Sequence, residues 1–297
     1  MPPPAVVPSA PGSSTVRAPG LPLAAMRRLN PSLVAGAVLV ALVIVVALVS
    51  FVWTPYPPSR VDTSARLLGP SAEHWLGTDK FGRDLVSQIM VGARTTIFVG
   101  VIAVGVAAIF GVPLGILAAM GPRWLGQLVM RTSDLVLAFP ALLLAIMFGA
   151  VYGASTLTAM VAIGIATIPS FARVTRAGAL QVLSREYVLA ARVAGRRRLA
   201  IAVRHVLPNV SSLVIVQVSV SFAIAVLAEA ALSFLGLGTP LTTPSWGRML
   251  QESQELLSVA PRLAVVPGVA IAIAVLGFNL LGDGLRDRYD PKLEQAA

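Results

Sequence analysis

The sequence contains no cysteine, and charged residues make up only 12% of its 297 positions. The absence of cysteine excludes disulfides, thiolate metal ligands and cysteine nucleophiles. The only two histidines, His74 and His205, form no H-x-x-x-H or H-E-x-x-H pattern, so a metal site is not expected. Soluble proteins carry about 25% charged residues. The shortage of charge therefore indicates an integral membrane protein.

Apolar residues account for 56% of the chain and gather in six long blocks. A helix of about 20 apolar residues crosses the hydrocarbon core of a bilayer, and each block is long enough to do so. The blocks run roughly over residues 33–53, 95–120, 132–152, 155–174, 210–232 and 263–283. We therefore expect an all-α integral membrane protein with six transmembrane helices.

The first apolar block follows Arg27 and Arg28, as the core of a secretory or twin-arginine signal would. Its length of about 21 residues exceeds that of a signal core and suits a transmembrane helix. Thr-Pro-Tyr-Pro-Pro follows it in place of a small-residue cleavage site, and Trp53 and Tyr56 are placed at the membrane interface. Residues 1–25, rich in Pro, Ala, Ser and Gly, predict a disordered tail.

Positive charge is concentrated in the connection between the fourth and fifth blocks. From Arg173 to Asn209 this connection carries eight arginines and one acidic residue. Cytoplasmic loops of membrane proteins are enriched in Lys and Arg. The connection and both termini are therefore assigned to the cytoplasmic side. The net charge of +10 is attributed to topology rather than to nucleic-acid binding.

Within this connection, residues 185–209 read REYVLAARVAGRRRLAIAVRHVLPN. At 3.6 residues per turn, one helix face holds Tyr187, Ala190, Ala191 and Ala194, and the opposite face holds Arg185, Arg192 and Arg196. Gly195 is expected to end this helix in a left-handed conformation. A second short helix is expected over 197–206, with Pro208 stopping it. The residues alone fit either a helix held to lipid headgroups or a small-faced helix that docks on a protein.

The spacing from Glu186 through Gly195 to Pro208 resembles the E-A-A…G…I-x-L-P signature of ABC importer permeases, with His205 at the isoleucine position. Three further stretches, HWLGTDKFGRD from His74, EAALSFLGLG from Glu229 and NLLGDGLRD from Asn279, resemble the C-type permease of dipeptide and oligopeptide importers. With DLVLAFP at 134–140, the resemblance covers about 27–293. The signature and the three further stretches occur in the right order on a six-helix chain, which makes the resemblance specific.

The resemblance implies the type I ABC importer permease fold in the inner membrane of a bacterium. It implies half of a translocation pathway for di- or oligopeptides. The implied partners are a homologous second permease, two cytoplasmic ATPases that bind ATP and Mg, an extracytoplasmic solute-binding protein and the lipid bilayer. The chain has no G-x-x-x-x-G-K-[ST] loop. It is therefore not expected to be an enzyme or to carry a cofactor of its own.

Two alternatives stay open beside the peptide importer. The same family imports nickel chelates, glutathione and other small solutes. A proton-coupled secondary transporter is an alternative of a different class. Asp134 and Glu229 are its candidate intramembrane acids, but their placement near opposite ends of the membrane suits a proton relay poorly.

The resemblance also assigns roles to individual residues. It makes the 185–209 stretch a coupling helix that sits in a groove of the ATPase. The implied ATPase-coupling residues are Glu186, Tyr187, Ala190, Ala191, Gly195, Leu207 and Pro208. Candidates for a gate or a binding-protein contact are Asp79, Arg83, Asp84, Arg94, Trp246 and Arg248, with internal pairing of these charges as the alternative. Asp134, Pro140, Glu229 and Asp283 belong to the structural motifs.

The chain is accordingly divided into four parts. They are a disordered cytoplasmic tail over 1–25, a first transmembrane helix with an outer segment over 26–94, the transmembrane permease domain over 95–285 and a cytoplasmic C-terminal tail over 286–297.

Overall fold

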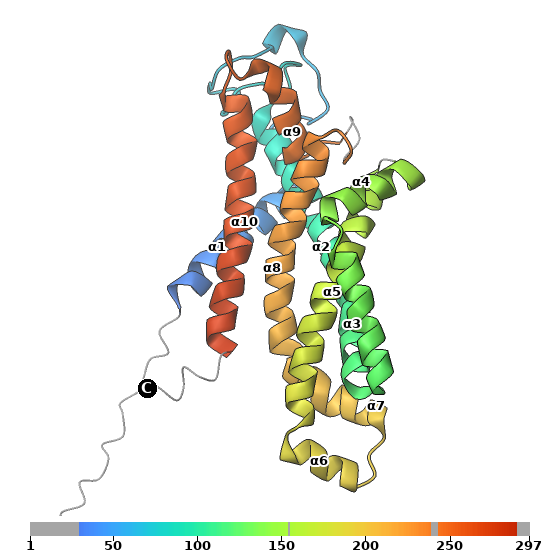
Figure 1. Cartoon of the computed structure of the whole chain (residues 1–297). Helices are drawn as coiled ribbons and strands as arrows, with labels where there is room; N and C mark the ends of the chain where they lie inside the picture. The colour runs from blue at the N-terminus through green and yellow to red at the C-terminus, as the bar shows by residue number, and fades with distance from the viewer. Residues whose placement is uncertain (1–29, 154, 239–242, 290–297) are drawn as a thin grey trace, which may run out of the picture.

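The structure is a computed structural model, and it describes residues 30–153, 155–238 and 243–289. Over these ranges the chain is mostly helical, segment 53–84 is largely irregular, and there is no strand longer than an isolated bridge. The helices form an elongated bundle, shown in Figure 1. The predicted tail at 1–25 and residues 290–297 lie outside the described residues. The predicted domain boundary at residue 94 falls within a continuous helix.

Five helices of the described ranges are long and apolar enough to cross a membrane. They are α1 (Pro31–Val52), α2 (Leu85–Met120), α5 (Thr156–Leu183), the continuous helix Arg198–Phe234 and α10 (Arg262–Tyr289). The continuous helix consists of α7 (Arg198–Ile201), the π-helix η2 (Ala202–Val206) and α8 (Leu207–Phe234). A bent pair, α3 (Arg123–Leu137) and α4 (Ala141–Tyr152), makes a sixth crossing when counted as one span. The predicted all-α membrane fold is confirmed.

The third predicted span, 132–152, is wrong as a single straight helix. α3 and α4 are bent by 82° at a break that includes Pro140. Proline has no N–H to donate, and it disfavours helical backbone at the residue before it, here Phe139. The apolar composition continues through the break, so hydropathy does not reveal it.

Very close backbone contacts hold α1 against α10. A Cβ on Gly36 would lie 2.3 Å from the backbone nitrogen of Leu281, and one on Gly284 would lie 2.5 Å from Leu33. Small residues are enriched at helix interfaces in membranes because burial of apolar surface gives no driving force there. The main core extends from α1 and α10 through α2, α5 and α8, where Phe222 and Phe278 stack at 4.0 Å between ring centroids.

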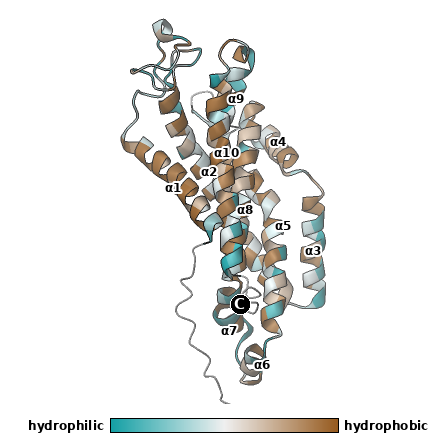
Figure 2. Cartoon of the chain, turned by 90° about the vertical axis from the view of Figure 1, so that its left-hand side faces the viewer, coloured by the Kyte–Doolittle hydropathy of each residue, from teal (hydrophilic) through white to brown (hydrophobic). Residues whose placement is uncertain are grey.

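The two ends of the bundle carry different structures. One end holds the segment 53–84 with its short helix η1 (Thr63–Ala65), and beside it α9 (Trp246–Ser253) and η3 (Gln254–Leu256) (Figure 1). The opposite end holds α6 (Glu186–Val193). Figure 2 shows hydrophobic residues along the long helices between these ends, and hydrophilic ones in the loops of segment 53–84. The bundle thus has an apolar middle and two polar ends, each a candidate interaction site.

Candidate functional site

At one end of the bundle, α6 ends at the predicted glycine. Gly195 adopts φ 76°, and its N–H donates to the carbonyl of Arg192 at 3.0 Å. The next N–H, that of Arg196, donates to the carbonyl of Ala191 at 3.1 Å. These bonds use carbonyls that the end of a helix otherwise leaves without partners. The predicted left-handed helix end is therefore confirmed.

A single buried side chain anchors α6 to the rest of the chain. Val188 is 0% exposed and belongs to a small second core. The other buried members of that core are Ala179 and Leu183 of α5, Ile201 of α7, Val206 of η2 and Val210 of α8. Val188 therefore joins α6 to α5 and to the long helix that begins at α7 through one close-packed core.

The alanine face of α6 is left uncovered by the described part of the chain. Ala190 and Ala194 are exposed, Ala191 is half-buried and Tyr187 is 47% exposed. The same end carries a polar hollow of about 830 Å³. It is lined by Gln181, Ser184, Arg185, Glu186, Tyr187 and Asn209. A small-faced helix beside a polar hollow is a surface that another protein can approach closely.

The prediction that Pro208 stops a second short helix is wrong. Leu207 and Pro208 begin α8, and the helix runs without a break from Arg198 to Phe234. In an α-helix the proline ring would clash with the carbonyl four residues earlier, at Arg204. The π-helix η2 has the wider i→i+5 pattern, in which the N–H of Leu207 donates to the carbonyl of Ala202. This local widening lets the helix accommodate the ring.

The π-helix also brings His205 to α6. The ring of His205 lies 6.0 Å from that of Tyr187, centroid to centroid. His205 stands where the ABC importer signature has isoleucine, so an aromatic side chain occupies this position in place of an aliphatic one. Figure 1 shows α6 and α7 together at this end of the bundle.

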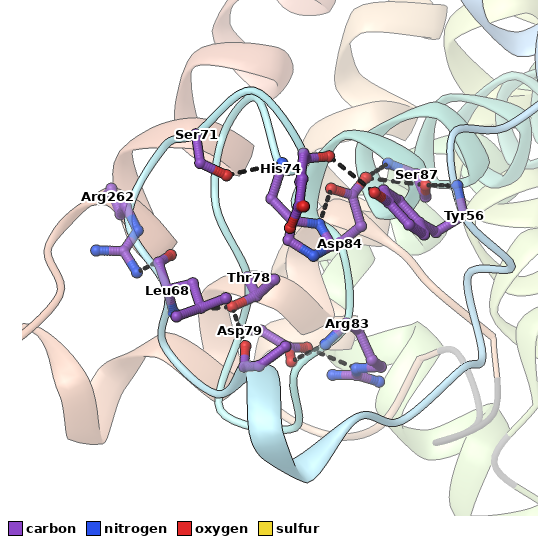
Figure 3. Close-up of polar contacts among 12 residues, drawn as sticks. Tyr56, Leu68, Ser71, His74, Thr78, Asp79, Arg83, Asp84, Ser87 and Arg262 are labelled. Atoms are coloured by element: carbon purple, nitrogen blue, oxygen red, sulfur yellow. Dashed lines mark hydrogen bonds and ion pairs between the residues drawn. The ribbon is translucent and has the colours of Figure 1, made fainter.

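At the opposite end, Asp79 organises a tight loop at the start of α2 (Figure 3). Its carboxylate accepts hydrogen bonds from the backbone N–H groups of Phe81 and Arg83, at 2.8 and 2.9 Å, and from the side chain of Gln88 at 2.8 Å. It also pairs with the Arg83 guanidinium. Asp79 is 7% exposed, so its carboxylate interacts with groups of this chain and not with solvent.

Asp84 closes the same loop onto α2 (Figure 3). One carboxylate oxygen accepts from the N–H and hydroxyl of Ser87, at 2.8 and 2.9 Å, and so caps the first turn of α2. The other oxygen lies 3.0 Å from Nδ1 of His74, whose ring packs against Tyr56 at 4.6 Å. Asp84 is 4% exposed, so this group also serves the fold of the segment.

The remaining outer candidates connect separate elements. Arg83 and Arg248 both pair with Glu252 of α9. Trp246 is 2% exposed and donates its indole N–H to the carbonyl of Ile89 at 3.0 Å. Arg94 donates to the hydroxyl of Ser50 at 3.2 Å and lies 3.8 Å from the ring centroid of Phe51. These contacts fasten α9 and α1 to α2.

All six outer candidates from the sequence are thus buried or half-buried and bonded within the chain. The side chain that sequence reasoning missed is Trp75, which is 60% exposed directly after His74. It lies in a turn closed by the hydrogen bond from the N–H of Gly77 to the carbonyl of His74 at 2.9 Å, and the His74 ring is bonded to Asp84. The tryptophan of the HWLG motif was the available signal, since tryptophan is enriched among the residues that contribute most to protein interfaces.

The structural-motif residues lie apart from one another. Asp134 pairs with Arg173 between α3 and α5. Glu229 is 3% exposed and shares hydrogen bonds with Ser233 and Ser245, which join α8 to the start of α9. Asp283 is exposed on α10. Within the described ranges, no group of three or more His, Cys, Asp or Glu side chains could hold a metal ion.

Comparison with known proteins places these features in a family. The profile of the family described as "Binding-protein-dependent transport system inner membrane component" matches residues 111–295. A dipeptide transport system permease protein, DppC, of Alkalihalophilus pseudofirmus is 41% identical over 89% of this chain and 87% of its own length. A di/tripeptide permease of Pseudomonas aeruginosa is 40% identical over 90% of both chains. A glutathione transport system permease protein, GsiD, of Pectobacterium atrosepticum is 40% identical over 88% of this chain and 87% of its own.

Proposed function

Because the chain belongs to the family of binding-protein-dependent transport system inner membrane components, we propose that it forms half of the pathway by which a bacterium imports dipeptides and oligopeptides. It is a permease subunit of an ABC importer, and separate subunits hydrolyse the ATP. The observation that carries the peptide assignment is identity of 40–41% to two peptide permeases over about nine-tenths of the chain. Glutathione, itself a tripeptide, is the second candidate cargo, since its permease is equally similar.

The complete transporter in this proposal contains a homologous second permease, two cytoplasmic ATPases with bound ATP and Mg, and an extracytoplasmic solute-binding protein. This chain supplies no covalent chemistry. Its part is to change shape when the ATPases close, and to receive the solute that the binding protein delivers. A ligand-driven change of this kind needs a contact at each end of the bundle.

The ATPase contact is α6. Its uncovered alanine face supports docking in a groove, and in this proposal Glu186, the first residue of the helix, pairs with a basic group of the ATPase. A carboxylate at a helix N-terminus is also favoured by the helix dipole. Movement of α6 passes through Val188 to α5 and the Arg198–Phe234 helix. Gly195 allows the chain to turn back from α6 towards α7.

The orientation follows from charge. Six crossings, with α3 and α4 counted as one, put both termini on the same side as α6. The arginine excess around α6 makes that side cytoplasmic. Segment 53–84 and α9 then face outward. Their charged groups act by holding the segment rigid, and the exposed Trp75 offers the binding protein its contact.

Uptake into proteoliposomes that contain the purified complex tests this function. We expect entry of a labelled dipeptide to require ATP on the ATPase side and the binding protein on the other. Unlabelled dipeptides should compete more strongly than glutathione. The reverse order of competition would assign the chain to glutathione import. Uptake that an ionophore abolishes while ATP is maintained would instead indicate a proton-coupled transporter.

A further inference from the structure

A long apolar groove lies between α2 and the helix that follows α6. Its volume is about 860 Å³. Residues of α2 from Ala108 to Met120, with Gly121 directly after them, line one wall, and residues from Arg198 to Leu207 line the other. Several of them are strongly exposed, including Ile109 at 68%, Leu117 at 53% and Val203 at 57%. The described part of the chain leaves this apolar surface open.

The sequence of α2 gives the depth of the groove in the membrane. The apolar run of α2 continues to Met120, and Gly121 and Pro122 then separate it from Arg123 and Trp124. Trp124 is 65% exposed. Arginine and tryptophan at the end of an apolar helix mark the boundary between hydrocarbon and headgroups. The groove therefore runs along the hydrocarbon region and ends at the cytoplasmic headgroups.

Positive charge gathers at that end. Arg198 lines the groove, as do Met120 and Gly121 at the end of the apolar run, and Arg196 and Arg197 precede Arg198 in the chain. All three arginines are exposed. None of the ion pairs found in the described part of the chain involves them. An apolar trough with unpaired guanidinium groups at headgroup depth complements an amphiphile with a negative head.

We propose that this groove binds an anionic phospholipid of the cytoplasmic leaflet. Its acyl chain lies along α2, and its phosphate lies at Arg198. A basic pocket between membrane helices on the cytoplasmic side is the arrangement that recognises anionic lipid headgroups. The second permease is the competing occupant, and a cross-link from the groove to it is the outcome that would identify it. The site thus adds a lipid partner to the ATPase and binding-protein contacts.

The position of the groove gives the lipid a role in coupling. Val203 and Leu207 belong to η2 and α8, the segment that receives displacement from α6. A bound lipid therefore rests against the element that moves. Anionic lipid is expected to favour the arrangement of α7 and α2 seen in this structure, because a ligand stabilises the state that it binds best.

A fluorescence experiment tests the site directly, since the chain has no native cysteine. A Val203→Cys variant carrying a bimane label is assembled into the complete transporter in phosphatidylcholine nanodiscs. Brominated phosphatidylglycerol or brominated phosphatidylcholine is then added at equal content. We expect stronger quenching by phosphatidylglycerol. Arg198→Gln should reduce this preference about fivefold, the factor for about 1 kcal/mol per arginine at a membrane surface.

Two companion variants separate charge from folding. Arg198→Lys keeps the positive charge and should retain the preference for phosphatidylglycerol. Arg123→Gln removes an exposed arginine that does not line the groove, and should leave the preference unchanged. Equal quenching by the two brominated lipids in the unsubstituted background would overturn the proposal. A second result would also overturn it: the unlabelled Val203→Cys chain cross-links to the second permease, and the labelled chain shows no quenching. Neither readout depends on which solute is transported.

Discussion

Gly195 ends α6 with a backbone angle that other residues adopt only at a cost. Its φ is 76°, and a Cβ placed there would meet no atom within 4 Å. A substitution therefore acts on the backbone alone and not through a clash. The left-handed conformation costs a residue with a Cβ about 1–2 kcal/mol. The backbone strain of the turn after α6 can therefore be tested separately from side-chain packing.

We predict that Gly195→Ala lowers peptide uptake per ATP hydrolysed, because the strained turn shifts α6 relative to α7. The measurement is uptake and ATP hydrolysis in parallel on the reconstituted complex. Gly105→Ala is the matched control, since its Cβ also meets open space but its φ is not positive. Equal losses in the two variants would remove the turn from the coupling mechanism.

Val188 gives a second prediction at the scale of one residue. Val188→Ala leaves a void in the small core, which weakens the anchoring of α6 by on the order of 2 kcal/mol. We expect ATP hydrolysis to persist while uptake falls, since α6 then moves without moving α5 and α8. Val265→Ala makes the same change at a 58% exposed position of α10 and should leave uptake unaltered. An unchanged ratio of uptake to hydrolysis in Val188→Ala would contradict the transmission path.

Asp62, in the outer segment, provides a prediction about pH. The hydroxyl and the N–H of Ser64 donate to its carboxylate at 2.5 and 3.0 Å and lower the pKa of Asp62. The unfolded pKa is about 3.9, and the folded pKa lies below it. Stabilisation of the turn is therefore complete above the unfolded value and is lost as the pH falls through the folded one.

Hydrogen exchange at Ser64 and Ala65 measures this effect. Corrected for intrinsic exchange rates, protection in the natural sequence should decline as the pH drops through the acid range below about 4. Asp62→Asn has no titrating carboxyl and should show protection that does not change over that range. A decline of the same size in both chains would assign the acid sensitivity to another group.

At the scale of an element, the bend between α3 and α4 was the feature that hydropathy did not predict. Both ends of α1 and the start of α10 lie close to those expected, because apolar composition changes sharply there, whereas α10 continues through polar residues to Tyr289, beyond the expected end at 283. α2 starts at Leu85 rather than near 95 because Ser87, Gln88 and Arg94 lower the hydropathy of its first turns, most of whose residues the structure buries. Hydropathy indicates whether a segment lies in lipid or in water. It does not indicate where a helix bends. Only Pro140 gave a local sign of the break.

Replacing that proline should change the direction of α4. In Pro140→Ala the backbone regains an N–H and loses the restriction on Phe139. We expect the angle between α3 and α4 to become smaller than the present 82°. Spin labels at Leu128→Cys and Val151→Cys, both exposed, would report a longer distance in the variant. An unchanged distance would mean that packing of α4 against α5, rather than the proline, fixes the bend.

At the scale of the whole molecule, the sequence predicted that the two ends of the bundle differ, and charge predicted which end is cytoplasmic. It offered internal pairing of the outer charges as one alternative, and the structure bears out that alternative, but it did not predict which residues pair. Arg83 finds its partner Glu252 169 positions away along the chain. Periodicity and motif spacing describe near neighbours and do not report pairings of this range. The same limit hid the groove beside Arg198, whose walls come from α2 and from the helix after α6.

The most direct test of the whole account is cross-linking from the alanine face of α6 to the ATPase. A single Ala190→Cys substitution in this cysteine-free chain is treated with a short bifunctional maleimide in the assembled transporter, against an ATPase cysteine at the edge of its groove. We predict a cross-link to the ATPase whose yield changes when ATP binds. Val265→Cys on α10 should give none. The contradicting result has two parts: Ala190→Cys forms no cross-link to the ATPase, and probes attached to lipids react with α6. That result would rule out this helix as the coupling element.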